Sequence, residues 1–244
     1  ILSSEIRKMT VRLRQAADSQ HRERMQLADA MADISHQLRT PLTAINLTLS
    51  MLGREGLPEQ ERRALLQELR RLVTRMEWLV ETLLKMSRID AGAVSFREES
   101  CRAADIIQRA VQPLAVPMEL RGITLETAAG EECFTGDAAW SAEALGNVLK
   151  NCMEHAASYI RVSARETALF TEITVQDDGP GFRAEDLPRL FERFYRGKDA
   201  APASVGIGLA LTRVVLSAQN GTIRADNACP GGALFTLRWY RSTV

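Results

Sequence analysis

The sequence predicts an α+β protein: a long N-terminal helical hairpin that forms a dimeric four-helix bundle, followed by an α/β sandwich domain. Three observations support this fold class. Apolar residues recur every three or four positions as far as Asp90, which is typical of amphipathic helices. A turn with two glycines and a proline, at 53–58, divides this helical part in two. After Gly92, short apolar runs alternate with helical ones, which indicates a sheet covered by helices.

The composition disfavours several classes of function. The chain has 244 residues, and its 31 basic and 31 acidic side chains leave no net charge, so neither a nucleic-acid groove nor a polybasic membrane patch is expected. No apolar run reaches the roughly 18 residues that span a bilayer. The four cysteines form no Cys-x-x-Cys pair, and we expect reduced thiols in the core. Because the chain starts inside a helix and without Met, we expect a fragment, attached to a membrane only through a segment absent from this chain.

The first helix is expected at 1–52, where residues 1–24 would transmit a signal into a hairpin at 25–91. Its apolar positions include Leu27, Met31, Ile34, Leu38, Leu42, Ile45, Leu49 and Leu52. In the second helix, apolar residues alternate four and three apart for three heptads; they are Leu65, Leu69, Leu72, Met76, Leu79, Leu83 and Met86. Leu66, Val73 and Val80 widen this stripe. Two helices alone cannot cover it, so we predict a homodimer; the alternative is packing on the chain's own second domain.

Residues 92–244 are expected to form one α/β domain. Runs with helical periodicity separate its strand-like segments, and no internal repeat stands out. The predicted strands are Val94–Glu99, Ile123–Thr127, Tyr159–Ala164, Leu169–Val175, Gly221–Asp226 and Ala233–Trp239.

His36 is expected on the solvent side of the first helix. At 100° per residue it lies about 140° to 160° from the apolar residues nearest to it, so it points away from the apolar stripe. Thr40 follows one turn later, and Pro41 lacks the N–H that would bond to the Gln37 carbonyl. A solvated neutral imidazole has a free ring nitrogen and can act as a nucleophile. By itself, however, an exposed histidine is most often an ordinary surface residue.

The segment 34–43 changes this interpretation. It reads Ile-Ser-His-Gln-Leu-Arg-Thr-Pro-Leu-Thr and resembles the H-box of sensor histidine kinases, which usually has His, an acid, Leu, Arg or Lys, Thr, Pro and Leu. The resemblance implies that His36 accepts a phosphoryl group and that Thr40 assists dephosphorylation of a partner protein. The acid is replaced by Gln37, whose amide can orient an imidazole but cannot take its proton near neutral pH. We therefore expect slow autophosphorylation.

Four segments of the second domain resemble, in the expected order, the nucleotide-binding boxes of the same family and of its wider ATPase superfamily. In the first, Asn147 and Asn151 share one helix face at i and i+4, so their amide oxygens can point together at Mg²⁺ and the phosphates it bridges. The resemblance assigns Asn151 to the metal. It implies a nucleotide contact for His155, where an aromatic residue or a histidine is common in the family, but a capping or packing histidine is an equal alternative. Glu154 departs from the pattern, because relatives commonly carry a basic residue there. Without this context, two such asparagines are most often solvated surface.

The other three boxes complete the predicted ATP pocket. By resemblance, Asp177 reads the adenine amine, while Gly179 and Gly181 let the backbone approach the base. The segment 190–196 resembles the F-box, which borders a lid expected at 198–205. The fourth box opens a helix whose free N–H groups favour phosphate, with Ala210 in place of a frequent glycine. The contacts expected from these last two boxes are Phe191, Phe194, Arg196, Gly206, Gly208 and Leu209. The alternatives are a core anchor for the two phenylalanines and a docking role for the arginine.

The resemblance spans about residues 36–240 and implies a protein-histidine kinase. Such an enzyme phosphorylates its histidine from Mg-ATP and passes the phosphoryl group to an aspartate of a response regulator. It would be the cytoplasmic portion of a bacterial inner-membrane protein. Two alternatives stay open. One is a dimeric nucleotide-binding scaffold or phosphatase with weak or absent kinase activity; the other is an ATPase that closes a clamp on DNA or client proteins, which leaves the H-box without a role.

Overall fold

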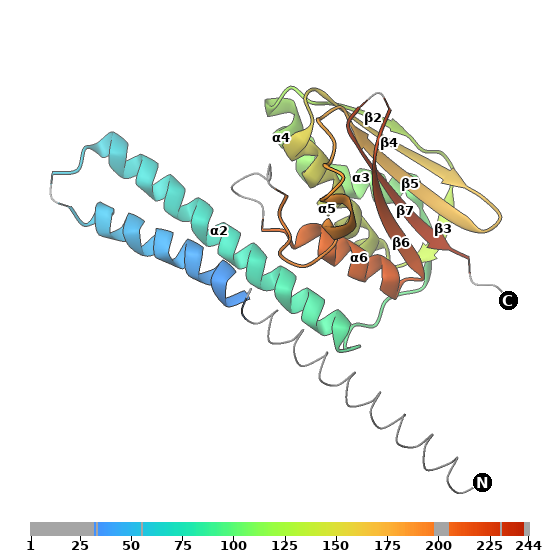
Figure 1. Ribbon diagram of the computed structural model, residues 1–244, viewed down its shortest axis with the longest axis horizontal. Helices are drawn as coiled ribbons and strands as arrows, with labels where there is room; N and C mark the ends of the chain where they lie inside the picture. Colours follow the sequence, from blue (N-terminus) through green and yellow to red (C-terminus); the bar gives the residue numbers. More distant parts are fainter. Residues whose placement is uncertain (1–31, 33, 55, 198–204, 230, 242–244) are drawn as a thin grey trace, which may run out of the picture. The chain divides into compact units, whose positions relative to one another are not determined.

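The computed structural model describes residues 32, 34–54, 56–197, 205–229 and 231–241 (Figure 1). The chain divides into two compact units, Ile1–Trp78 and Leu79–Val244. The division falls inside the long helix α2, Glu59–Asp90, which therefore belongs to both units. The domain limits at 24/25 and 91/92 stay predictions, and the first of them lies outside the described residues.

The predicted helical hairpin begins in the N-terminal unit, and its second helix continues into the second unit. Residues 34–52 are helical without a break, and α2 returns after a turn that includes Gly53 and Gly56. The rest of the predicted first helix, 1–31, lies outside the described residues.

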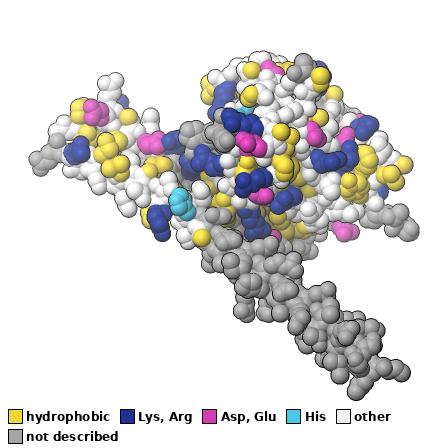
Figure 2. All heavy atoms as spheres, in the orientation of Figure 1, with side chains coloured by type: hydrophobic (Ala, Val, Ile, Leu, Met, Phe, Trp, Pro, Cys, Tyr) yellow, Lys and Arg dark blue, Asp and Glu magenta, His cyan; other side chains and the backbone are white. Residues whose placement is uncertain are grey.

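Two sets of apolar residues repeat every seven positions along α2. Leu72, Leu79 and Met86 are buried, with exposed fractions of 7%, 2% and 2%. By contrast, Leu66, Val73 and Val80 remain 41–42% exposed. On the first helix Leu42 and Leu49, also seven residues apart, are both 49% exposed. Apolar side chains are visible among charged ones on the face of the hairpin in Figure 2, so each helix carries an uncovered apolar stripe.

The second unit contains a two-stranded and a five-stranded sheet. Its own helices are α3 Ala103–Val111, α4 Ala115–Leu120, α5 Ala138–His155 and α6 Gly208–Ala218, with short 3-10 turns at Gln112–Leu114 and Leu187–Arg189. The small sheet pairs β1, Glu99–Arg102, with β3, Cys133–Gly136. The large sheet has the order β2-β4-β5-β7-β6; its strands are β2 Thr124–Ala128, β4 Tyr159–Glu166, β5 Phe170–Asp177, β6 Gly221–Asn227 and β7 Ala233–Tyr240.

Helices cover one face of the large sheet (Figure 1). Strands β2 and β4 run parallel, and the other neighbours are antiparallel. Successive side chains of a strand point to opposite faces, and those on the helical side form the core; Ile173, Val175, Phe235, Leu237 and Trp239 are each at most 1% exposed. This core packs α5 against β5, and both elements carry predicted nucleotide residues. The predicted fold class, a helical hairpin followed by an α/β sheet domain, is confirmed.

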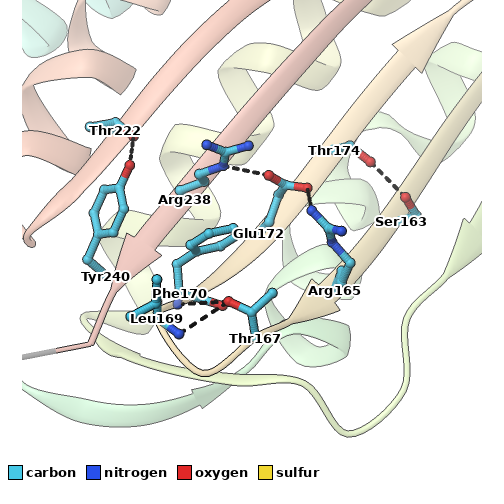
Figure 3. A network of polar contacts seen from close by, with 10 residues as sticks. All are labelled: Ser163, Arg165, Thr167, Leu169, Phe170, Glu172, Thr174, Thr222, Arg238 and Tyr240. Carbon is cyan, nitrogen blue, oxygen red and sulfur yellow. Dashed lines mark hydrogen bonds and ion pairs between the residues drawn. The ribbon is translucent and has the colours of Figure 1, made fainter.

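The opposite face of the large sheet is polar (Figure 3). Glu172 on β5 is only 7% exposed, and its carboxylate accepts hydrogen bonds from Arg165 on β4 at 3.2 Å and from Arg238 on β7 at 2.5 Å. The Arg238 guanidinium also lies 4.7 Å from the centre of the Phe170 ring. Because each carboxylate oxygen has a charged donor, Glu172 is a satisfied group that links three strands.

The strand predicted at Val94–Glu99 is wrong. Residues 93–98 have no regular structure, and β1 begins only at Glu99. The alternating pattern of this segment has a different cause, because Phe96 packs against Trp140 of α5 with ring centres 5.6 Å apart. The prediction also missed β3. The other five predicted strands are present, with ends that differ by at most two residues.

The four cysteines are free, as predicted. Cys101 and Cys152 are buried, and burial raises the pKa of Cys101 to about 11. The expectation of core thiols is wrong for Cys229, which is exposed in the connection between β6 and β7. Pro230 and two glycines follow it, so the apolar run around it is a turn rather than a buried strand.

Charged side chains are spread over the surface. Figure 2 shows Lys and Arg side chains interspersed with Asp and Glu side chains on the visible face, in agreement with the balanced composition. Within the part of the chain that the structure describes, no helix combines the length and the apolar character needed to cross a membrane.

Candidate functional site

The predicted phosphoacceptor residues lie on the helix at 34–52. His36 and Thr40 are exposed, and Gln37 is half-buried. The Thr40 hydroxyl donates a hydrogen bond to the His36 carbonyl at 3.3 Å, so the two residues are one turn apart on the same side. Pro41 is buried and provides no N–H for the Gln37 carbonyl. The prediction that His36 faces solvent is confirmed, which leaves its imidazole open to another molecule.

Helix α5 carries the first predicted nucleotide box. Asn147, Asn151 and His155 are four residues apart, so they form one stripe along the helix, and all three are half-buried. The stripe is about 12 Å long. Its two ends meet different loops: a Cβ on Gly208 would lie 3.4 Å from Asn147 Oδ1, and a Cβ on Gly179 would lie 2.4 Å from the His155 carbonyl oxygen. The stripe therefore connects the start of α6 to the loop after β5.

Asp177, the last residue of β5, is 1% exposed. Its Oδ1 accepts hydrogen bonds from the N–H groups of Gly179 and Ala233, both at 2.9 Å. Its Oδ2 is buried and has no hydrogen-bond partner among the described residues. Burial and the nearby Asp177 carboxylate raise the pKa of the Cys152 thiol on α5. Because a buried oxygen without a donor is costly, Oδ2 is suited to accept a hydrogen bond from a bound molecule, such as the amine of adenine.

Glycines let the neighbouring loops approach the Asp177 backbone closely. A Cβ on Gly232 would lie 1.8 Å from the Asp177 carbonyl oxygen, so only glycine fits there without a shift of the backbone. Gly181 has a φ of +73°, a conformation that favours glycine. With Gly179 against His155, the loop after β5 is held between the end of α5 and the connection that precedes β7.

Asp178 has a different role from its neighbour. Its carboxylate accepts hydrogen bonds from the N–H groups of Ala157, Ser158 and Tyr159 at 2.9–3.1 Å, and from the Ser158 hydroxyl at 2.7 Å. Burial acts to raise the pKa of Asp178, but the hydrogen bonds from Ser158, Tyr159 and Ala157 outweigh it and lower the pKa to about 2. Asp178 is thus fully engaged in the fold, whereas Asp177 keeps one oxygen free.

The start of α6 forms the other end of the candidate site. The residue before it, Ile207, provides no side-chain cap, so the first N–H groups and the helix dipole favour an anion there. Gly206 has a φ of +74°, and Leu209 packs against the core. Thr212 donates a hydrogen bond to the Ala144 carbonyl of α5 at 3.0 Å, which fixes the two helices to each other.

The predicted F-box lies next to this helix. Phe191 is buried and belongs to the core, while Arg196 is exposed. Phe194 is half-buried, and its N–H donates a hydrogen bond to the Gly206 carbonyl at 2.9 Å. The structure therefore brings Phe194 and Gly206 together. Of the expected lid at 198–205, only Val205 lies within the described residues.

The site has two ends that suit the two parts of a nucleotide. Asp177 and Gly179 lie at one end of the α5 stripe, and Asn147 and Gly208 lie at the other. The side-chain nitrogen of Asn147 is also buried and lacks a hydrogen-bond partner in the described part of the chain. No group of three or more His, Cys, Asp or Glu that could hold a metal occurs among those residues; the predicted metal ligand is the Asn151 amide oxygen, a kind of ligand that Mg²⁺ accepts.

Sequence reasoning missed several residues that shape this site. Two of them, Asp178 and Ala233, are described above. Asp178 lies inside the motif that contains Asp177, so the motif drew attention to its position. Ala233 lies outside every motif, and nothing in the sequence marked it. The side-chain amide of Asn227 on β6 accepts a hydrogen bond from the Phe182 N–H at 2.7 Å and donates one to the Phe182 carbonyl at 2.8 Å. Asp186 accepts a hydrogen bond from the Tyr195 hydroxyl. These contacts join segments far apart in the sequence, and spacing alone does not reveal them.

Comparison with known proteins bears on both units. Residues 26–92 match the family model of the His Kinase A (phospho-acceptor) domain. Residues 136–243 match the model of the histidine kinase-, DNA gyrase B- and HSP90-like ATPase. The chain belongs to the histidine kinase family. The two matches follow the order in which the sequence presents its H-box and its nucleotide boxes.

Curated relatives carry the same family name. Signal transduction histidine-protein kinase AfsQ2 of Streptomyces coelicolor is 33% identical over 225 residues, which cover 85% of this chain and 41% of AfsQ2. Signal transduction histidine-protein kinase/phosphatase MprB of Mycolicibacterium smegmatis is 32% identical over 246 residues, which cover 94% of this chain and 48% of MprB. The chain thus spans just under half the length of these relatives.

Solved histidine kinase structures share the fold. The histidine kinase AdeS of Acinetobacter baumannii superposes with a TM-score of 0.72 at 21% identity, covering 85% of this chain and 98% of AdeS. The mycobacterial sensor histidine kinase MprB superposes with a TM-score of 0.53 at 23% identity, covering 59% of this chain and 97% of that structure.

Proposed function

We propose that this chain is the kinase portion of a sensor histidine kinase, which phosphorylates His36 from Mg-ATP and passes the phosphoryl group to an aspartate of a response regulator. One observation carries the proposal: Asp177 is a buried carboxylate whose Oδ1 is saturated by backbone N–H groups and whose Oδ2 has no donor among the described residues. A nucleotide base with an exocyclic amine supplies that donor. The match to both family models and the exposure of His36 support the same activity.

In the proposed complex, the nucleotide lies along α5. Asp177 accepts a hydrogen bond from the adenine amine, and the phosphates meet the N–H groups at the start of α6, beside Gly206 and Gly208. The Asn151 amide oxygen would hold Mg²⁺, which would supply positive charge against the phosphates. Arg196 contacts the phosphate end as a charged donor. The remaining predicted contacts are Asn147, His155, Gly179, Gly181, Phe191, Phe194 and Leu209.

His36 is the nucleophile of the proposed reaction. A ring nitrogen of the neutral imidazole attacks the γ-phosphorus in line, so a nitrogen–phosphorus bond forms while the bond to the ADP oxygen breaks. The other ring nitrogen then loses its proton. Gln37 can accept a hydrogen bond from that N–H and orient the ring, but its amide cannot take the proton, so water is the acceptor. Without a carboxylate base beside His36, this proton transfer makes a slow kinase.

Thr40 supports a second activity at the same place. Its hydroxyl lies one turn from His36 and is exposed, so it can position a water molecule against a phosphorylated regulator docked on this helix. The relative MprB is named a kinase/phosphatase. We therefore include dephosphorylation of the response regulator in the proposal.

The proposal includes a homodimer located in the cytoplasm, as part of a bacterial inner-membrane protein. The exposed apolar residues of the hairpin repeat every seven positions on both helices, which is the pattern of a four-helix bundle seam. A second hairpin would cover them. Cytoplasmic ATP supplies the phosphoryl group. Nucleic acid is not a direct partner in this proposal.

Incubation of the purified chain with Mg²⁺ and ATP labelled on the γ-phosphate tests the proposal. We expect a protein label that is labile in acid and stable in base, absent in His36→Ala and retained in His21→Ala. Titration of ATP measured in parallel by calorimetry separates the alternatives. Binding without label would indicate the nucleotide-binding scaffold, and absence of both would contradict the pocket assigned to Asp177.

A further inference from the structure

The backbone at Phe194 is strained. Phe194 has a φ of 62°, the left-handed conformation that bulky L-residues rarely adopt. Such a conformation is unfavourable and persists only where the surroundings hold it. Asn220 is the other described non-glycine residue with a positive φ, and asparagine tolerates that region far better than phenylalanine. The segment that follows Phe194 is therefore held in place by specific contacts.

Backbone contacts with Gly206 hold one side of this bend. The Phe194 N–H donates to the Gly206 carbonyl at 2.9 Å, and Gly206 is itself left-handed with a φ of +74°. A Cβ on Gly206 would lie 2.2 Å from the Tyr195 carbonyl oxygen. The chain just before Arg196 thus lies directly against the residue that leads into α6. This contact brings Arg196 to the proposed phosphate end of the site.

Asp186 holds the other side through Tyr195. The Tyr195 hydroxyl donates to Asp186 Oδ1 at 2.5 Å, and Asp186 is only 8% exposed. This hydrogen bond raises the pKa of Tyr195. The Arg189 guanidinium lies 4.3 Å from the centre of the Tyr195 ring, and Arg189 Nε is 3.0 Å from Glu192 Oε2. The Tyr195 side chain is therefore fixed at its hydroxyl and on one ring face.

The same carboxylate also contacts the residue on the far side of Arg196. A Cβ on Gly197 would lie 3.0 Å from Asp186 Oδ2, so this oxygen leaves little room for a side chain there. Asp186 thus lies beside both chain neighbours of Arg196: its Oδ1 accepts from the Tyr195 hydroxyl, and its Oδ2 faces Gly197. A buried carboxylate in this place fixes the backbone from which the arginine extends.

We infer that Asp186 and Tyr195 are positioning residues that aim Arg196 at the phosphates of bound ATP. The inference rests on the proposed nucleotide site and adds to it the residues that set the arginine's place. Preorganising a charged donor lowers the entropy lost when the ligand binds, so loss of the anchor weakens phosphate binding even though neither anchor residue touches the nucleotide.

A double-mutant cycle on ATP affinity tests this inference, with the whole chain, Mg²⁺ and calorimetry. We expect Arg196→Ala to weaken ATP binding about tenfold, as for loss of one charge-assisted hydrogen bond. Tyr195→Phe and Asp186→Ala should each weaken it by about three- to tenfold in the unmodified chain, and by less than about twofold in the Arg196→Ala background. Asp186→Asn, which keeps an acceptor for the tyrosine hydroxyl, should retain most of the affinity.

Tyr240→Phe is the matched control, because the Tyr240 hydroxyl shares a hydrogen bond with the Thr222 hydroxyl at 3.2 Å, at the end of β7 opposite to Ala233, which donates to Asp177. Its ATP affinity should equal that of the unmodified chain. Equal losses from Tyr195→Phe with and without Arg196 would show a merely structural role and overturn the inference. The inference also fails if Arg196→Ala leaves the ATP affinity unchanged, because Arg196 then makes no phosphate contact that Asp186 could position. Failure of the proposed function is distinct, because the unmodified chain then binds no ATP. Tyr195→Phe removes a single oxygen atom, so the test survives if Asp186→Ala does not fold.

Discussion

The helical hairpin and the sheet domain differ in how completely they cover their apolar residues. In the sheet domain, Ile160, Val175 and Leu237 are 0% exposed, because helices pack over one face of the sheet. In the hairpin, Leu66, Val73 and Val80 stay 41–42% exposed. The sheet domain therefore completes its own core, whereas the hairpin presents a stripe that its own described helices leave open. Stability of the sheet domain should not depend on protein concentration, but that of the hairpin should.

The largest effect is expected from a cavity in the sheet core. Leu237→Ala removes a fully buried side chain on β7 and should lower the free energy of unfolding of the sheet domain by about 3 kcal/mol. Urea denaturation followed by tryptophan fluorescence measures this change. Leu169→Ala, where the side chain is 70% exposed, is the matched control and should change stability by less than about 0.5 kcal/mol. A dependence of the Leu237→Ala transition on protein concentration would contradict a self-contained core.

A smaller loss is expected at Asp178, which holds the loop beside the nucleotide site. Asp178→Asn should lower the free energy of unfolding by about 2 kcal/mol at pH 7, because several N–H donors lose their charged acceptor. The pKa of Asp178 is depressed to about 2 in the folded protein. Its contribution is therefore fully present above about pH 4 and is lost as the pH falls through about 2.

Denaturation of the unmodified chain and of Asp178→Asn between pH 7 and pH 2 measures this contribution. The difference between the two should shrink toward the acid end. Asp226→Asn, at an exposed position of β6, is the control. A difference that stays constant over the whole range would mean that the Asp178 charge does not stabilise the fold.

The same two regions show how far sequence reasoning reaches. The hairpin and five of the strands could be predicted, because each depends on periodicity within a few turns or residues. The strand at Glu99–Arg102 could not, since it exists only through pairing with Cys133–Gly136, and neither segment is long enough to show a pattern. Motif residues such as Asn147 and Asp177 could be named as candidates because their segments resemble, in the expected order, the nucleotide-binding boxes of the family.

The residues that hold the loops around the candidate site could not be predicted for a related reason. Asp186 meets Tyr195 and Gly197 only because the chain bends at Phe194, whose left-handed conformation no propensity favours. Asn227 meets Phe182 from a strand 45 residues later in the chain. Side chains that bind a ligand leave a chemical pattern in the sequence, whereas those that hold a loop act through contacts that appear only in three dimensions.

The smallest of these effects concerns the open stripe of the hairpin. Val73→Ala removes two carbon atoms from a side chain that is still 41% exposed in one chain, so most of its cost should appear only when a second hairpin covers it. We expect the dissociation constant of the homodimer, measured by sedimentation, to rise about tenfold, and stability of the dissociated chain to change by less than about 0.5 kcal/mol. Leu120→Ala, at a position of α4 that is 83% exposed, should leave the dissociation constant unchanged. Two results would contradict this prediction: a chain that stays monomeric at high concentration, and a Val73→Ala dimer as tight as the original. Either would mean that a second hairpin does not cover the stripe, so the hairpin would not differ from the sheet domain in needing a partner to bury its apolar residues.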